Sequence, residues 1–474
     1  LAQTQEEEDA FNYIEFRPAQ KHGVSVVGSI AHVIKGALGA GILSGHVAFM
    51  KIGLAVAVPM TAVFGMYMTY CLYTLVHCAQ IMYRRTRVTS MAYSDLGEAA
   101  VACFPNPKVK KWAKYFFNRY QCFFLCLLPH TYLQILKSSD MRPSPCVLIC
   151  FLLRIIIDVG ITIDLFGSCA CYQIIIAKSI KQLVENTQIT TLEGKGGLPH
   201  IRVYMAAMII PIIIICMIRQ LKYLAPFSLG ANLVVVLCII MTVYYAFQVN
   251  PGFENLVMYT KFRNLFEFVG MSVFSMSCAG VVIPVENNMK DPHRFNTVLF
   301  VGMSSVVFCT FLVSFFGYVG YRELCTSPIT VNFPMKTLPM VLKGLIALMI
   351  FITHALNFWV PFNICFFYIK QRVNEQKLLF WEYFFRGFFV LIISLVGITF
   401  PTVDNLIGFI GALCLSNMAF IWPNIIGILV YWSRPGFGRF QWRLWKHIFL
   451  TAVGMFFLVC GTWVNGHELI KTLL

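Results

Sequence analysis

Apolar runs of about twenty residues recur along this chain, and they constrain its fold more than any other feature. About 20 helical residues rise by about 30 Å, the thickness of the hydrocarbon core of a bilayer. Because a backbone inside lipid must satisfy its own hydrogen bonds, each run predicts one membrane-spanning helix. The sequence therefore predicts an all-α polytopic membrane protein with eleven transmembrane helices. The runs cover residues 25–47, 52–82, 155–180, 201–218, 227–248, 265–288, 297–320, 338–369, 380–400, 405–432 and 447–469.

The composition agrees with a protein dissolved in lipid. Only 12% of the 474 residues are charged and 58% are hydrophobic, which is too few charges to cover a soluble domain of this size. The net charge of +16 is spread between the apolar runs, so it indicates orientation in a membrane and not nucleic-acid binding. The 17 cysteines show no spacing typical of a metal site, and small apolar packing is the interpretation we prefer. We expect no metal and no cofactor.

The distribution of lysine and arginine predicts the orientation. The basic residues concentrate on one set of alternate connections, which by the positive-inside rule face the cytoplasm. This places the amino terminus inside and the carboxyl terminus outside. The acidic run "EEED" is the opposite of a signal-peptide leader, so we expect the first apolar run to be retained. Residues 1–24 then form a cytoplasmic tail, and residues 25–470 form the transmembrane domain.

The first span, "AHVIKGALGAGILSGHVAF", is unusually rich in glycine. Gly36, Gly39 and Gly41 lie within six residues, and each glycine costs a helix interior about 1 kcal/mol relative to alanine. A break here would leave a half-helix N-terminus that can bind a substrate carboxylate. The alternative is a small-residue packing face, with Gly41 and Gly45 letting two helices approach closely.

The sixth span carries a similar weak segment. Its sequence "FSMSCAGVVIPVENNMKDP" places Ser275, Ser277 and Gly280 in a cluster of small residues, with Pro284 shortly after. In a fold of two inverted five-span repeats, the sixth span is the counterpart of the first, and both are interrupted at the substrate site. We therefore predict a first repeat at about 25–248, a second at about 265–432, and an additional eleventh span at 447–469.

Several motifs resemble one known family. "HVIKGALGAGIL" at 32–43 and "GVVIPVENNMKDPHRF" at 280–295 resemble signatures of the proton-coupled amino-acid transporters of the amino acid/auxin permease superfamily, with this chain as a divergent, insect-like member. The resemblance implies a leucine-transporter-like fold of eleven spans. It also implies proton-driven transport of small neutral amino acids across a plasma or lysosomal membrane. Gly36, Gly39, Ala40 and Gly41 match the family's unwound substrate loop, and His32 matches a histidine linked to proton coupling.

Two features depart from the family pattern. Ser277 and Cys278 stand where the family has a glutamate and a glycine in the sixth span. Residues 117–153 fall outside the resemblance, and they are either translated non-coding sequence or a genuine insertion.

Titratable residues in the spans need a reason, because charge in a membrane is costly, and four of them bear on the predicted site. His32 suits a proton carrier but could equally be a hydrogen-bonded structural histidine. We expect Lys35 to brace the unwound carbonyls of the first span. Asp164, where the family usually has an uncharged residue, could offset Lys35 or His32, or be protonated. Glu286 lies four residues before Lys290, which favours a local ion pair, with a gate latch as the alternative.

These observations predict a secondary active transporter of small neutral amino acids, with a proton as the coupling ion and the lipid bilayer as its surroundings. The substrate site would comprise Gly36, Gly39, Ala40, Gly41, Ser275, Ser277 and Gly280. The alternative is a transporter-like amino-acid sensor with little flux, which the altered sixth span motivates. An enzyme is not expected, because the chain contains no nucleophile elbow, P-loop or HExxH motif.

Overall fold

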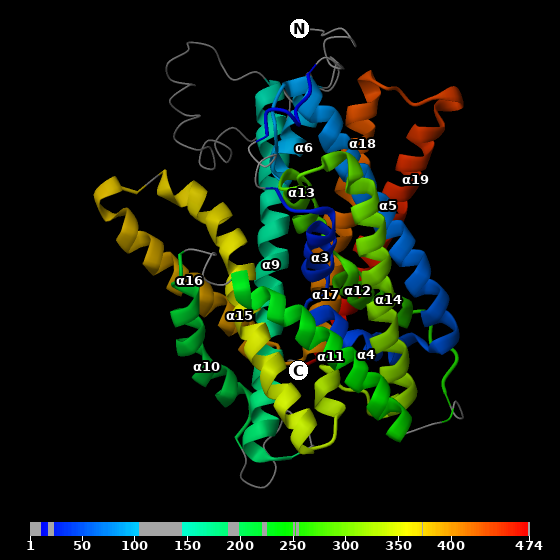
Figure 1. Ribbon diagram of the computed structural model, residues 1–474, viewed down its shortest axis with the longest axis vertical. Coiled ribbons are helices and arrows are strands. Elements are labelled where there is room, and N and C mark those ends of the chain that lie inside the picture. Colours follow the sequence, from blue (N-terminus) through cyan, green and yellow to red (C-terminus); the bar gives the residue numbers. More distant parts are fainter. Residues whose placement is uncertain are drawn as a thin grey trace.

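The computed structural model describes residues 11–17, 23–103, 145–187, 199–219, 225–249, 252, 256–371 and 373–472. Many helices, among them α5, α9 and α14, run roughly along the long axis of the molecule, whereas α11 and α16 cross it obliquely (Figure 1). No strand occurs in these described ranges, where a single isolated bridge joins Val24 to Met289. The predicted all-α class is confirmed.

Each predicted span is overlapped by one helix or by a set of consecutive helices. In chain order these are α3 (Val26–Ala37) with η1 (Ala40–Ser44) and α4 (Gly45–Ile52), α5 (Leu54–Thr86), α9 (Pro145–Glu185), α10 (Ile201–Cys216), α11 (Ala225–Val249), α12 (Asn264–Met276) with α13 (Ala279–Asn287), α14 (Phe295–Tyr321), α15 (Thr337–Lys370), α16 (Leu378–Thr399), α17 (Val403–Ile410) with η7 (Gly411–Ile421) and α18 (Trp422–Ser433), and α19 (Trp442–Lys471). The short helix α6 (Tyr93–Ala102) lies between the second and third spans.

Length and composition alone assign fewer crossings than eleven. Within the described part of the chain, eight helices are long and apolar enough to cross a membrane, and the bent pair at the start makes nine. Helix α10, with 16 residues, is shorter than a full span. The membrane class is therefore confirmed, whereas the count of eleven stays a prediction.

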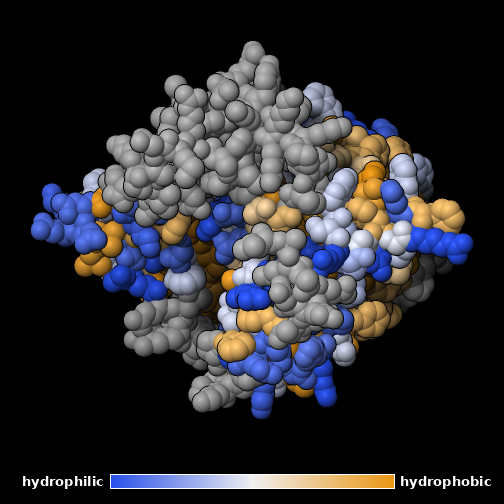
Figure 2. All heavy atoms as spheres, turned by 90° about the horizontal axis from the view of Figure 1, so that it is seen from above, coloured by the Kyte–Doolittle hydropathy of each residue, from blue (hydrophilic) through white to orange (hydrophobic). Residues whose placement is uncertain are grey.

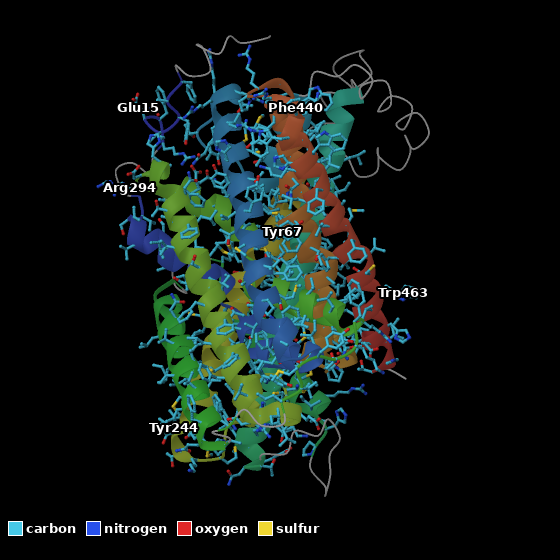
Figure 3. All side chains as sticks on the ribbon, turned by 90° about the vertical axis from the view of Figure 1, so that its right-hand side faces the viewer. Glu15, Tyr67, Tyr244, Arg294, Phe440 and Trp463 are labelled. Carbon is cyan, nitrogen blue, oxygen red and sulfur yellow. The ribbon has the colours of Figure 1, made fainter. Side chains whose placement is uncertain are left out.

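The sixth span lies in the centre of the bundle and α16 lies at its edge. In the apolar window of α12 and α13, 78% of the residues are buried, against 28% in that of α16. Helix α16 instead exposes large apolar side chains, including Phe380, Phe384 and Leu395, as a lipid-facing helix does. Figure 3 shows the same contrast between Tyr67, inside the bundle, and Trp463, which points away from it.

The two ends of the bundle differ from its middle. Hydrophilic side chains gather on the face that carries residues 11–17, here called the amino-terminal face (Figure 2). Glu15 and Phe440 lie toward this face, whereas Tyr244 lies at the opposite end (Figure 3). At that opposite end, Arg263 before α12 pairs with Glu468 near the end of α19 at 2.6 Å.

The first and sixth spans are both interrupted, as the sequence predicts. Helix α3 ends at Ala37, Leu38 and Gly39 leave helical geometry, and the chain bends by 48° before it continues through η1 and α4. Helix α12 ends at Met276; Ser277 is extended with φ −77° and ψ 132°, and α13 begins at Ala279. These breaks occupy the same position in the two proposed repeats.

Part of the predicted organisation falls outside the described residues. Of the predicted tail 1–24, the structure describes residues 11–17, 23 and 24. Of the segment 117–153, it describes only the part from Pro145 onward, which forms the first turns of α9. The domain boundaries and the origin of that segment therefore stay predictions.

Candidate functional site

A cavity of about 340 Å³ lies between the two helix breaks. Its volume is at the lower end of the range of small-molecule sites, about 300–1,000 Å³. Helices α3, α9, α12, α13 and α15 contribute to its wall, together with η1 and the π-helical segment η7. Its lining includes His32, Lys35, Gly36, Gly39, Gly41, Asp164, Ser168, Tyr172, Ser277, Gly280, Thr353, Asn357, Leu415 and Met418.

The glycines of the first span are needed for close approach as well as for the break. A Cβ on Gly41 would stand 2.5 Å from the Cα of Ser275, and one on Gly39 would stand 2.9 Å from the hydroxyl of Tyr172. Gly45 is equally tight, against the hydroxyl of Ser314. Close packing and a broken helix are therefore both present in this segment. Gly280 differs, because nothing lies within 4 Å of its added Cβ.

The residues predicted from the sixth span take different positions. Ser277 lines the cavity, and its hydroxyl accepts from the backbone N–H of Ala279 at 3.4 Å. Ser275 is buried behind the cavity wall, and its hydroxyl lies 2.8 Å from the carbonyl oxygens of both Gly41 and Met271. Ser275 therefore joins the two breaks to each other. Ala40, the remaining predicted residue, begins η1 beside Gly41.

His32 and Lys35 reach the cavity from α3. His32 also borders a second cavity of about 610 Å³, which opens toward Arg17, Thr89 and Asn288 near the amino-terminal face. Lys35 makes no hydrogen bond or ion pair with any described residue, so the expected bracing of the unwound carbonyls is not seen. Both side chains are free to meet an occupant of the central cavity.

Glu286 does not line the central cavity. The prediction that it pairs with Lys290 is wrong. Its carboxylate pairs with Arg17, with Nη2 of Arg17 3.0 Å from Oε2. Lys290 is exposed instead. The segment that carries Arg17 shows no regular pattern in the sequence, so nothing there predicts an ion pair with Glu286. The i,i+4 spacing along the helix predicts Lys290 instead.

Aromatic rings and backbone oxygens complete the surroundings of Arg17. Its guanidinium lies 4.9 Å from the ring centroid of Tyr13 and 5.1 Å from that of Tyr83, and its Nε donates to the carbonyl of Thr89 at 2.6 Å. Burial raises the pKa of Tyr13 to about 12, and the nearby Glu286 carboxylate adds to the rise. Tyr13 therefore stays a neutral phenol beside the ion pair.

Sequence reasoning missed several polar residues in the cavity. Asn357 of α15 donates to the hydroxyl of Tyr172 of α9 at 2.9 Å, and Thr353 lines the cavity one turn before Asn357. Two polar residues spaced i,i+4 on an otherwise apolar helix predict side chains that face the interior of the bundle, because polar side chains inside a membrane usually do so.

The chain between α14 and α15 joins the first span on the side away from the amino-terminal face. The hydroxyls of Ser44 and Ser327 are hydrogen-bonded. His46 Nε2 lies 3.0 Å from the carbonyl oxygen of Thr326, and Lys178 Nζ donates to the carbonyl of Ser327 at 2.6 Å. The Ser44 and His46 contacts hold the second half of the first span against that chain segment, and Lys178 joins the same segment to α9.

Sequence comparison identifies the family. The family model described as "transmembrane amino acid transporter protein" matches residues 22–140 and 148–465. The chain belongs to this family of transmembrane amino acid transporters. Membership points to a transport role and not to catalysis, and it confirms the resemblance seen in the motifs of the first and sixth spans.

Named relatives of this transmembrane amino acid transporter agree with the assignment. The chain is 31% identical over 447 residues to the proton-coupled amino acid transporter-like protein pathetic of Drosophila melanogaster, covering 94% of this chain and 85% of that protein. It is 22% identical over 330 residues to the probable amino acid transporter skat-1 of Caenorhabditis elegans, covering 67% of this chain and 70% of that one.

Among solved structures, this transporter is similar to MHP1, a nucleobase-cation-symport-1 family transporter in a closed conformation with bromovinylhydantoin bound. The sequence identity is 14%, the TM-score is 0.45, and the match covers 95% of this chain and 93% of that one. Across the described residues of the transporter, no group of three or more His, Cys, Asp or Glu side chains could hold a metal ion.

Proposed function

We propose that this protein is a secondary active transporter of small neutral amino acids and that it couples their movement to protons. The observation that carries the proposal is the cavity of about 340 Å³ between two helix breaks. Discontinuous helices place backbone polar groups and helix ends at the middle of a membrane, where an amino acid could replace its lost hydration. Apolar side chains such as Leu415 and Met418 would contact the rest of a small substrate.

The substrate carboxylate would bind at the first break. Gly41 lines the cavity where the second half of the first span begins. Unsatisfied N–H groups at such helix starts favour a negative charge. Lys35 of α3 adds a basic side chain to the cavity wall beside this break.

His32 is the residue that we propose for proton coupling. It borders both the central cavity and the cavity toward the amino-terminal face. An imidazole changes its charge near physiological pH, so its protonation can favour one state of the transporter over another. We propose that the amino-terminal face is cytoplasmic and that the host membrane is the plasma or lysosomal membrane.

Radiolabelled uptake of a panel of amino acids at two external pH values tests this function. We expect uptake of small neutral amino acids that increases as the external pH falls. Counterflow in proteoliposomes separates this function from the sensor alternative, because only a transporter exchanges labelled for unlabelled substrate across the membrane. Saturable binding without counterflow would reject transport and favour the sensor.

A further inference from the structure

One wall of the cavity presents a carboxylate that the transport mechanism above does not use. Asp164, Ser168 and Tyr172 follow one another at intervals of four residues along α9, which places them on one face of the helix. All three line the central cavity. Tyr172 is held by Asn357 at 2.9 Å, whereas Asp164 makes no hydrogen bond or ion pair with any described residue.

Asp158, another carboxylate on α9, is paired within the protein. Asp158 accepts from the hydroxyl of Tyr368 at 2.7 Å, and one of its oxygens lies 3.9 Å from Nε of Arg154. Ionisable groups in transmembrane helices normally pair with each other or mark a substrate or ion pathway. Asp158 follows the first pattern, so the cavity position of Asp164 fits the second.

The other charged side chains of the cavity indicate which charges a ligand bound there would carry. His32 and Lys35 approach from α3, on the wall that also carries Gly36 and Gly41. That wall favours the negative end of a ligand. Asp164, on the wall formed by α9, favours a positive end. An occupant that satisfies both walls carries one charge of each sign.

We propose that the Asp164 carboxylate binds the ammonium group of the transported amino acid. This inference rests on the proposed transport function and deepens it, because it assigns the positive end of the substrate to one residue. The carboxylate accepts charge-assisted hydrogen bonds from the ammonium group, and such bonds are about twice as strong as neutral ones. The site thereby requires a substrate with a protonated amino group and rejects analogues that lack it.

Equilibrium binding to the purified full-length protein tests this assignment with alanine and with propionate, which lacks the amino group. The wild type should bind alanine more tightly than propionate by roughly 10- to 100-fold, the strength expected of hydrogen bonds to a charged group. In D164N that preference should disappear, through weaker binding of alanine and unchanged binding of propionate. D158N, altered on the same helix outside the cavity, should keep the wild-type preference.

Three outcomes would overturn the assignment. Equal binding of alanine and propionate by the wild type would show that no group of the protein binds the ammonium group. An equal loss of both ligands in D164N, while thermal unfolding is unchanged, would assign Asp164 a role in shaping the cavity. Retained alanine affinity with a lost pH dependence in D164N would make Asp164 a proton carrier instead.

Two further measurements distinguish the ammonium group from a metal cation, and substrate binding from transport. Replacing Na⁺ by N-methylglucamine should leave the alanine affinity unchanged, and a Na⁺ dependence that D164N removes would assign the carboxylate to a metal cation. Counterflow is scored separately from binding. Failed counterflow with an intact preference for alanine would reject transport alone, and intact counterflow without that preference would reject the role of Asp164 alone.

Discussion

The guanidinium of Arg17 and the carboxylate of Glu286 form a nearly fully buried ion pair. Nη2 of Arg17 lies 3.0 Å from Oε2 of Glu286, and the two side chains are only 3% and 0% exposed. Gln80 and Tyr83 of α5 lie 3.3 Å and 3.4 Å from the same carboxylate. The segment 11–17 is therefore fastened across α5 and α13 at the amino-terminal face.

Removing the arginine should destabilise the protein strongly. In Arg17→Gln the Glu286 carboxylate would stay buried without its charged partner, and breaking a buried pair from one side costs about 3–5 kcal/mol. We expect a clearly lower apparent melting temperature in a thermal-shift assay of the detergent-solubilised protein.

Arg294→Gln is the matched control for this variant. Arg294 pairs with Asp291 at 3.2 Å but is 71% exposed, and exposed pairs contribute about 0–1 kcal/mol. A double-mutant cycle of Arg17→Gln with Glu286→Gln should show strong coupling. Additive effects of the two changes would contradict the ion pair.

Two glycines of the cavity should respond oppositely to a methyl group. In Gly41→Ala the new Cβ would meet the backbone of Ser275 at 2.5 Å, so we expect poor recovery of folded protein in size-exclusion chromatography. In Gly280→Ala nothing lies within 4 Å, so the protein should fold. Its methyl group would enter the cavity and raise the KM for larger amino acids more than for glycine. Normal folding of both variants with unchanged selectivity would refute this prediction.

The hydroxyl of Ser275 should matter for stability. Ser275→Ala would leave the carbonyl of Gly41 without this hydrogen bond, and an unsatisfied buried group costs about 1–3 kcal/mol. Ser305→Ala provides the comparison, because the Ser305 hydroxyl bonds at 2.8 Å to Val301 of its own helix, at an exposed position. We expect thermal stability and uptake to fall in the first variant and to stay near wild type in the second. Equal effects would show that the link between the breaks contributes nothing special.

His32→Gln should remove the acid stimulation of uptake that the proposed proton coupling predicts. Glutamine keeps hydrogen-bonding capacity but cannot gain a proton in this pH range, so uptake should vary little between pH 5.5 and 7.5, roughly one unit either side of the ordinary imidazole pKa of about 6.5. His293→Gln, altered at an exposed position near the amino-terminal face, should keep the wild-type pH profile. An undiminished acid stimulation in His32→Gln, at equal surface expression, would assign proton coupling elsewhere.

Much of this architecture could be predicted from the sequence, because lipid leaves few alternatives for a long apolar run. The breaks after Ala37 and Met276 were also visible, since glycine, serine and cysteine clusters weaken a helix locally. Both lie within the segments chosen from the residues alone. In the two predicted inverted repeats, the break in the first span corresponds to the break in the sixth.

Contacts between distant segments could not be predicted in the same way. Arg17 and Glu286 are separated by 269 positions, and no periodicity relates an irregular segment to the end of a helix. Its place in the small-residue cluster predicts that Ser275 meets the substrate, but its hydroxyl turns toward Gly41 behind the cavity wall. Which way a small side chain faces at a break depends on the local backbone, and helical spacing no longer fixes that direction.

The position of His32 on the border of two cavities has a consequence for the order of events. A ligand leaving the central cavity toward the amino-terminal face would pass the imidazole, and water entering from that face would reach the same ring. Substrate and proton would therefore leave along a shared exit path, so that departure of the substrate would expose the imidazole to the water that accepts its proton.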